Sequence, residues 1–452
     1  MKRFWLVLLS LGLIMAFSAS AFAVDVKVSG EYYAAGMYLN KTAVVNNDVY
    51  TNNVLTTKAD ESTAFFYQRL RIGADFIVSP SLKLVTRFDV MERIWGGARS
   101  APGTSLDTLS AGTRAENENI AFDLMYVSYD SPIGLFKVGY QLDAAWGTIF
   151  MDSANPRGTV AWSYTNGPWW FYLGYKTFND NSFSAVTTAT VATDVDQEKS
   201  ALAFKYIGKD AEGGLLGGHV RNASASTLNV DAKNLIYYLQ PYAKAKFGPV
   251  SVQAEFDYFW GDYPKDSSNL VAVPDEKLEL MAGWVDATAN FDMFYAGGTV
   301  AYVSGDDPGT TDKIEGLAGL VNGGKDWNPC LIMFNNDVTY WIGNVSGNNG
   351  SSISGPMANA WFGQGRVGVK PIPQLDAMLS VSYATADKKP KDFVGGTYGW
   401  EIDITNTYKI TNNLSYMLGV GYLFTGDYYK GTGVNNKVTD DYMLINKLTL
   451  SF

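Results

Sequence analysis

Regularly spaced charged side chains occur in the stretch "QRLRIGADFIVSPSLKLVTRFDVMERIW". Alternate side chains of a β-strand point to the same face of its sheet. By this rule, one face of two neighbouring strands carries the basic residues Arg69, Arg71, Lys83, Arg87 and Arg93, together with Asp75 and Asp89. Arginine stays charged at any working pH. The pattern therefore predicts a fixed basic wall that attracts anions, and the plainer alternative is the ordinary polarity of a water-facing surface.

Acidic residues with the same alternation occur in two other stretches. The four that would face the basic wall are Glu255, Asp257, Glu401 and Asp403. Opposed groups of fixed charge across a narrow aqueous passage create a field that orients and sorts solutes. These residues predict a charged constriction, although their spacing does not fix its position along the passage.

Catalytic chemistry has little support in the sequence. The chain has one histidine, His219, and a Ser-His-Asp hydrolase needs that side chain beside a nucleophile and an orienting carboxylate. Ser224 and Ser226 follow closely, but no nucleophile-elbow motif accompanies them. We therefore expect no enzyme activity and an ordinary lumen- or interface-facing His219, with pH sensing as a further alternative because histidine titrates near neutral pH.

Metal and cofactor motifs are also sparse. Cys330 is the single cysteine, so the sequence has no cysteine cluster for zinc and no haem-attachment motif. The stretch "SGDDPGTTDKIE" offers Asp306, Asp307 and Asp312 as oxygen ligands of the kind that calcium prefers. Their spacing matches no EF-hand loop, so a solvated acidic loop is the alternative. No cofactor is expected.

The N-terminus has the form of an export signal. Lys2 and Arg3 precede the apolar run "FWLVLLSLGLIMAF", and Ala21-Phe22-Ala23 forms an A-x-A cleavage site. We predict a cleaved signal peptide over residues 1–23 and a single mature domain over 24–452, with an uncleaved anchor as the alternative. Loss of Lys2 and Arg3 changes the formal net charge from −10 to −12. We expect no nucleic-acid partner, because phosphate binding needs a basic surface.

The mature sequence repeats one unit of strand, short turn, strand and long polar connection. In "WEIDITNTYKITNNLSYMLGVGYLF", apolar and polar residues alternate on both sides of a turn at 411–413. Other short turns are expected at 79–81, 131–134, 166–168, 208–213, 248–249, 287–291 and 371–374. Longer connections are expected at 40–62, 97–118, 180–197, 262–275, 305–355, 387–397 and 427–440.

About nine such hairpins fit the chain. They predict an all-β fold, a transmembrane antiparallel up-and-down β-barrel of 16–18 strands, 18 favoured, with short periplasmic turns and long extracellular loops. A β-sandwich is the alternative, but its strands are shorter than these. Pro241 interrupts one strand, where we expect a β-bulge because proline cannot donate to the ladder.

The last strand has a regular apolar face. Tyr442, Leu444, Leu448, Leu450 and Phe452 share one parity. In lipid every backbone donor and acceptor needs a partner, so this strand should pair with the first one, "VDVKVSGEYYAAGMYL", and close the ring. Aromatic rings are favoured at the two membrane interfaces, where we expect Tyr442 and Phe452.

These features resemble the outer-membrane porins of Gram-negative bacteria. The resemblance rests on the signal peptide, the alternating hairpins and the terminal "LTLSF". "RLRIGADFIVSPSLKLVTRFDVMERIWG" and "YKITNNLSYMLGVGYLFTGDYYKG" are similar to a porin group of Gram-negative anaerobes. The resemblance implies a place among outer-membrane lipids, a homotrimer, and a terminal signal read by barrel-assembly machinery. The residues of that signal are Tyr442, Leu448, Leu450 and Phe452.

The function that the resemblance implies is a water-filled channel for passive diffusion of small hydrophilic solutes and ions. Three further functions stay open: a solute-specific channel that prefers anions, the barrel sheath of a porin–cytochrome electron conduit, and a receptor or adhesin that uses residues 305–355. Larger porins fold a loop into the lumen. The sequence offers two candidates, "LDAAWGTIFMDSANPRG" and residues 305–355, where "DKIEGLAGLV" could form a short helix.

Overall fold

A computed structural model describes residues 24–51, 54–96, 120–143, 145–180, 195–223, 233–263 and 276–452. The predicted signal peptide, the connection 97–118 and most of the connections 180–197 and 262–275 lie outside the described residues.

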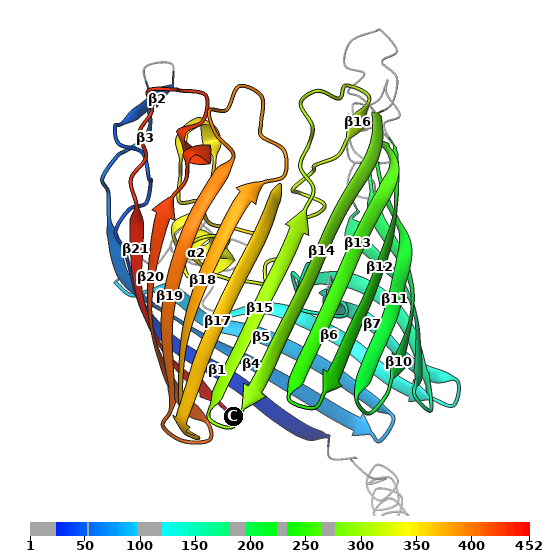
Figure 1. Cartoon of the computed structure of the whole chain (residues 1–452). Helices are drawn as coiled ribbons and strands as arrows, with labels where there is room; N and C mark the ends of the chain where they lie inside the picture. The colour runs from blue at the N-terminus through cyan, green and yellow to red at the C-terminus, as the bar shows by residue number, and fades with distance from the viewer. Residues whose placement is uncertain are drawn as a thin grey trace, which may run out of the picture.

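Eighteen long strands of the described chain form a closed antiparallel barrel (Figure 1). Each strand pairs with the strands before and after it, and β21 pairs with β1. The strands are β1 (Asp25–Leu39), β4 (Thr63–Ser79), β5 (Leu82–Ile94), β6 (Ile120–Ser131), β7 (Gly134–Asp143), β8 (Asn155–Asn166), β9 (Trp169–Asn179), β10 (Gln197–Ile207), β11 (Ala211–Asn222), β12 (Asn234–Phe247), β13 (Val250–Tyr263), β14 (Glu276–Phe291), β15 (Phe294–Val303), β17 (Ala360–Ile372), β18 (Leu375–Ala386), β19 (Thr397–Lys409), β20 (Leu414–Thr425) and β21 (Asp441–Ser451). The predicted barrel and its favoured strand number are confirmed.

Short elements lie in the connections. β2 (Val49–Thr51) pairs with β3 (Val54–Thr57), and β16 (Lys313–Ile314) runs parallel to β14. The helical pieces are α2 (Asn336–Ile342), η2 (Asn348–Gly350) and η3 (Asp427–Lys430). Within the described residues, no helix has the length and apolar character needed to cross a membrane.

Ring closure takes the predicted form. The register between β1 and β21 runs from Glu31 opposite Ser451 to Leu39 opposite Met443. Gly30 and Phe452 then exchange two backbone hydrogen bonds, N to O, of 2.8 and 2.9 Å. The last residue is thus part of the ladder.

Most of the predicted turns are confirmed at the end of the barrel opposite the long connections (Figure 1). The turn predicted at 287–291 is wrong, because β14 continues through Phe291 and the chain turns at Asp292 and Met293. Asp292 has a φ of 51°, a left-handed conformation that aspartate tolerates in tight turns. The small and polar residues before it, which suggested a turn, pair with β15 instead.

Pro241 causes no bulge, so that prediction is wrong. The β12–β13 ladder pairs Leu239 with Tyr258 and resumes with Tyr242 opposite Glu255, in the same register. On its other side, Pro241 still pairs with Leu215 of β11. The missing donor therefore interrupts one ladder for two residues, and no extra residue is needed to accommodate it.

The two faces of the barrel differ as the alternation predicts. Large apolar side chains of β20 are exposed on the outer face: Tyr416, Leu418, Val420, Tyr422 and Phe424. The inner face carries the charged side chains, and the buried core lies inside the ring. It combines inward-facing strand residues, such as Tyr33 and Tyr238, with residues of two segments that enter the lumen, including Phe150, Ile332 and Met333.

Cross-linking can test the closure. Ala34 lies directly opposite Leu448, and facing residues of antiparallel strands are about 4.5–5.5 Å apart at Cα, within disulfide range. We expect the double variant Ala34→Cys/Leu448→Cys to form an intramolecular disulfide, seen as a change of mobility in non-reducing electrophoresis. Ala34→Cys/Leu444→Cys is the control, because four residues along β21 add about 13 Å. Equal cross-linking in both variants would contradict the register.

Candidate functional site

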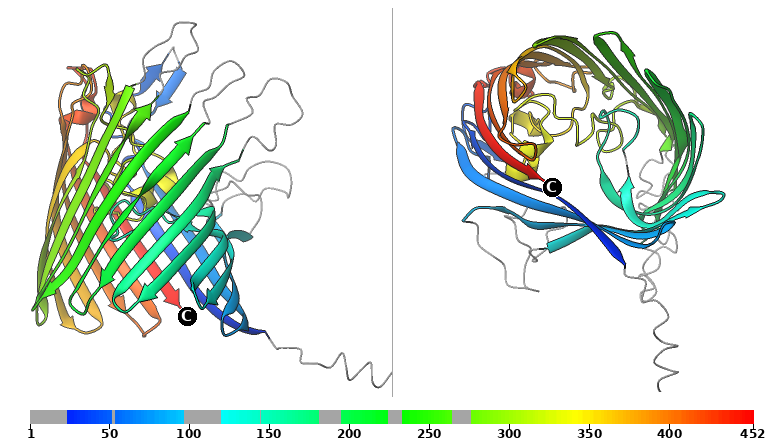
Figure 2. Two further views of the ribbon diagram at one scale, coloured as in Figure 1. Left: turned by 90° about the vertical axis from the view of Figure 1, so that its right-hand side faces the viewer. Right: turned by 90° about the horizontal axis from the view of Figure 1, so that it is seen from below.

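Two connections fold into the lumen, and both were candidates in the sequence. The short inner segment comprises residues 145–154, between β7 and β8, and the long inner segment comprises residues 304–359, between β15 and β17. Seen along the barrel, the yellow long inner segment lies within the ring of strands (Figure 2, right). The passage through the barrel is therefore set by these segments as well as by the wall.

The short inner segment is held by the wall opposite the basic residues. Thr148 donates from its backbone N and its Oγ1 to Glu255 Oε2, at 2.8 and 2.7 Å. The indole of Trp146 donates to the Gln240 carbonyl at 2.8 Å and packs edge-on against Tyr242. A carboxylate that accepts a backbone N–H and a hydroxyl is a strong anchor, because charge-assisted hydrogen bonds are stronger than neutral ones.

The long inner segment is anchored by the same chemistry. The backbone N–H groups of Ile332 and Met333 donate to the two carboxylate oxygens of Glu401, each at 2.7 Å. Gln364 donates to the Pro329 carbonyl at 2.7 Å. Asn335 then caps α2, accepting from the backbone N of Val338 at 3.1 Å.

The two inner segments contact each other across the lumen. Met151 N donates to Gly323 O and Asp326 N donates to Asp152 O, both at 3.0 Å. The ring of Phe150 packs edge-on against Trp327, with centroids 5.2 Å apart. The segments therefore form one connected structure that spans the interior.

The predicted acidic wall does not line an open passage. Glu255, Asp257, Glu401 and Asp403 lie on the inner face, but their exposed fractions are 4, 0, 0 and 3%. Glu255 and Glu401 accept hydrogen bonds from the backbone of the inner segments. Asp257 and Asp403 accept from Gln240 and Ser380 of neighbouring strands. The prediction that they face the basic wall across water is wrong.

The basic residues border a cavity of about 700 Å³ between β4–β6 and the long inner segment. Arg71 makes two hydrogen bonds of 2.7 Å to Asp89, and Arg87 Nε lies 3.0–3.1 Å from both oxygens of Asp123. Arg69 lies 3.5 Å from Glu92. The wall is thus a row of ion pairs, in which neighbouring carboxylates compensate the arginines of the predicted basic wall.

Two members of the predicted basic set behave differently. Lys83 pairs with Asp75 at 2.7 Å and does not border the cavity. Arg93 does border it, but it pairs in register with Gln68, because an additional residue is accommodated at Met91, where φ is 53°. The alternation that selected Arg93 therefore does not hold beyond this bulge.

The long inner segment supplies the other side of the cavity, with residues that the strand alternation did not predict. They are Lys325, Asp326, Asn336, Asp337, Tyr340 and Trp341. The helix expected in "DKIEGLAGLV" does not form, and α2 begins after Asn335 and ends before Gly343. An asparagine N-cap, an aspartate in the first turn and a C-terminal glycine were the signals that could have located it. Burial raises the pKa of Asp326, and the nearby Asp337 adds to this effect.

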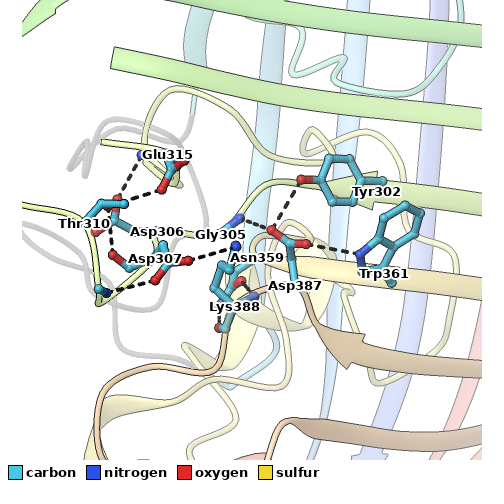
Figure 3. Close-up of polar contacts among 11 residues, drawn as sticks. Tyr302, Gly305, Asp306, Asp307, Thr310, Glu315, Asn359, Trp361, Asp387 and Lys388 are labelled. Carbon is cyan, nitrogen blue, oxygen red and sulfur yellow. Dashed lines mark hydrogen bonds and ion pairs between the residues drawn. The ribbon is translucent and has the colours of Figure 1, made fainter. Parts of the chain in front are cut away.

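The structure gives no support to the calcium candidate. Asp306 accepts from the backbone N of Glu315 and Asp307 from that of Gly309, each at 2.9 Å, and Lys388 lies 3.0 Å from the second oxygen of Asp307 (Figure 3). The Gly309 N–H and the Lys388 ammonium lower the pKa of Asp307. These carboxylates stabilise their own loop. Among the described residues, Asp306, Asp307 and Asp312 do not come together as a set of metal ligands.

His219 lies at the outer face of the barrel. It pairs with Ser200 of β10 and Tyr237 of β12, and the exposed Tyr237 ring lies 6.3 Å from the imidazole ring. Ser224 and Ser226 lie outside the described residues. This position gives no support to a catalytic role in the lumen.

Known proteins are similar in structure and not in sequence. No family model matches the chain, and no curated protein matches it. Among solved structures, OccAB1 of Acinetobacter baumannii is 10% identical with a TM-score of 0.53, over 96% of this chain and 99% of that one. The outer-membrane protein OpdK and OccK9 (OpdG), both of Pseudomonas aeruginosa, are 13 and 14% identical, each with a TM-score of 0.51 over 94% of this chain and 99% of theirs.

The chain shares the closed β-barrel fold of these proteins. Identities this low show the fold alone. The narrower resemblance to a porin group of Gram-negative anaerobes stays a prediction.

Asp152 should make the short inner segment of this barrel pH-sensitive. Its Oδ1 accepts from the Trp146 backbone N at 2.7 Å, and burial, with Glu255 and Asp326 nearby, raises its pKa to about 8. An unfolded aspartate has a pKa of about 3.9. The folded segment thus keeps a proton that the free chain loses, so its stability falls as the pH rises from about 4 to 8.

We expect larger fluctuations of single-channel current at pH 8.5 than at pH 5. Asp152→Asn should reduce this difference, because the amide cannot ionise. Asp262→Asn, at an exposed ion pair with Lys277, is the control. If the Asp152→Asn channel has the same pH dependence as the unmodified channel, Asp152 is not the source of the pH sensitivity.

Proposed function

We propose that the protein is an outer-membrane porin through which small hydrophilic solutes and ions diffuse passively. The observation that carries the proposal is the charged cavity inside a closed barrel whose outer face is apolar. An apolar outer band and a polar interior are the arrangement of a barrel that crosses lipid and conducts water. The predicted signal peptide supports export to the outer membrane of a Gram-negative bacterium.

The size and lining of the cavity support solutes of a few hundred daltons. Its volume of about 700 Å³ lies in the range of small-molecule sites, about 300–1,000 Å³. The charges around it nearly balance: six basic residues, Arg69, Arg71, Arg87, Arg93, Arg157 and Lys325, face five acidic ones, Asp89, Glu92, Asp123, Asp326 and Asp337. Such a lining favours weak selectivity between cations and anions.

A solute-specific channel for anions is the second candidate. Its support is that Arg71 and Arg87 keep 30 and 20% of their side-chain surface exposed while ion-paired. A guanidinium group has five N–H donors, so each can donate to a passing carboxylate or phosphate as well as to its fixed partner.

An electron-conduit role and an enzymatic role have less support. A cytochrome could occupy the barrel only if the inner segments left the lumen, and both are hydrogen-bonded to the wall. We also propose that the protein is not an enzyme, which the outward position of His219 supports.

Conductance in planar bilayers tests the proposal. We expect ohmic channels with a small reversal potential in a salt gradient. Arg71→Gln/Arg87→Gln removes two charges and leaves Asp89 and Asp123 uncompensated, so the reversal potential should shift toward cation preference. The shift should be larger at low salt, because charges are screened beyond about 10 Å at 0.1 M.

Asp123→Asn should produce the opposite shift, and Phe88→Leu on the outer face should produce none. Absence of channels from heat-modifiable, folded protein would contradict the porin proposal. If the arginine and aspartate variants have the same ion selectivity as the unmodified channel, the narrowest charged region lies elsewhere in the barrel.

Deletion of Phe452 tests the proposed assembly signal. The residue contributes two backbone hydrogen bonds to closure and is the last position of the apolar face with Tyr442, Leu448 and Leu450. We expect several-fold less heat-modifiable barrel in outer-membrane fractions, and normal single-channel conductance in the barrels that do form. Phe452→Tyr, which keeps the ring and backbone, should assemble normally. Normal yield after deletion would contradict recognition of this residue.

A further inference from the structure

Three potential metal ligands meet where the long inner segment contacts β19. The Sγ of Cys330 and one carboxylate oxygen each of Glu401 and Asp403 all lie within 4.8 Å of one another. All three side chains are buried, with exposed fractions of 4, 0 and 3%. Among the described residues, no salt bridge joins a lysine or arginine to either carboxylate. Two acidic groups are therefore enclosed with a thiol and without a neighbouring cation.

One oxygen in this cluster has no hydrogen-bond partner. Asp403 Oδ1 is fully enclosed and unpaired within the described structure. Gly421 borders it: a Cβ there would lie 2.7 Å from Asp403 Oδ1 and 3.5 Å from Glu401 Oε1. A side chain at this position would therefore collide with Asp403 Oδ1 and with Leu331 Cβ, 3.0 Å away, so β20 can pass this close to the carboxylate only with a glycine. A buried unpaired oxygen is costly, and a bound ion would remove that cost.

We propose that Cys330, Glu401 and Asp403 bind a divalent transition-metal ion, with Zn²⁺ as the best match. Zinc accepts thiolate and carboxylate ligands in one tetrahedral site, whereas calcium and magnesium prefer oxygen ligands alone. With Zn–S of about 2.3 Å and Zn–O of about 2.0–2.2 Å, ligand atoms lie about 3.3–3.7 Å apart. The observed ligand atoms lie within 4.8 Å of one another, so they would have to move closer together on binding, and a fourth ligand such as water would complete the site.

The surrounding hydrogen bonds orient these ligands. Glu401 accepts from the backbone N–H groups of Ile332 and Met333. The Cys330 carbonyl accepts from Asn335 Nδ2 at 2.9 Å, and Ser380 Oγ lies 3.5 Å from Asp403 Oδ2. Partners of this kind fix ligand orientation in metal sites.

Binding would displace the thiol proton of Cys330 to solvent and form a metal–sulfur bond. The ion would join the long inner segment to β19 and hold the segment inside the lumen. The competing explanation is that Glu401 and Asp403 share a proton and no metal binds.

Cobalt substitution separates these explanations. The purified full-length barrel is refolded in detergent after removal of metals with a chelator, and then titrated with CoCl₂. We expect one Co²⁺ per chain and a near-ultraviolet thiolate-to-cobalt charge-transfer band, which ZnCl₂ removes by displacement. Cys330→Ser should lose the band, and Asp403→Asn should weaken binding at least tenfold. His219→Ala, which alters the only histidine, should leave both unchanged.

Wild-type protein gives a second readout that does not depend on the folding of the variants. Zn²⁺ bound during refolding should protect Cys330 from a thiol reagent in partial denaturant, and a chelator should abolish that protection. No charge-transfer band and no protection would overturn the proposal in favour of the shared proton. A band that persists in Cys330→Ser would also overturn it. These measurements need no conductance, so they are independent of the porin proposal.

Discussion

Closure of one hydrogen-bonded ring is the constraint on which the other features depend. Every long strand of the described chain has two neighbours, and the ring closes through β1, β21 and the backbone pair of Gly30 and Phe452. A closed sheet has no free edge, so its inner and outer faces are separated all the way round. That separation lets the outer face be apolar while charged groups gather inside.

Buried carboxylates on the inner face decide how the interior is used. Glu255 and Glu401 each accept hydrogen bonds from the backbone of a segment distant in the sequence. A carboxylate left alone in such a position would be expensive to bury, and a loop left without partners would not stay ordered in the lumen. The buried carboxylates and the inner segments therefore stabilise each other. The anchored inner segments fill one side of the barrel and leave the charged cavity beside β4–β6.

The cavity itself is shaped by irregular strands. Bulges in the β4–β5 and β5–β6 ladders, at Met91 and next to Arg87, bring Glu92 and Asp123 to the inner face beside arginines. An extra residue in one strand exchanges the faces of all residues beyond it. The bulges thus convert a row of basic residues into a row of ion pairs, and a lining of balanced charge is what the proposed passive diffusion requires.

The sequence by itself determined the barrel. Alternation along each strand and the turn residues between strands specified about eighteen strands and their faces, because these depend on neighbours in the chain. The pairing of last with first followed from the need to pair every backbone group in lipid. It also offered, as alternatives, the two segments that enter the lumen. Only the tertiary structure decided that both inner segments enter the lumen together and that Glu255 and Glu401 bind their backbones. It also brought Cys330 next to Glu401 and Asp403. Those outcomes depend on groups far apart in sequence, such as Thr148 with Glu255 and Ile332 with Glu401. No local pattern encodes such contacts, and a single bulge is enough to change which face a charge occupies.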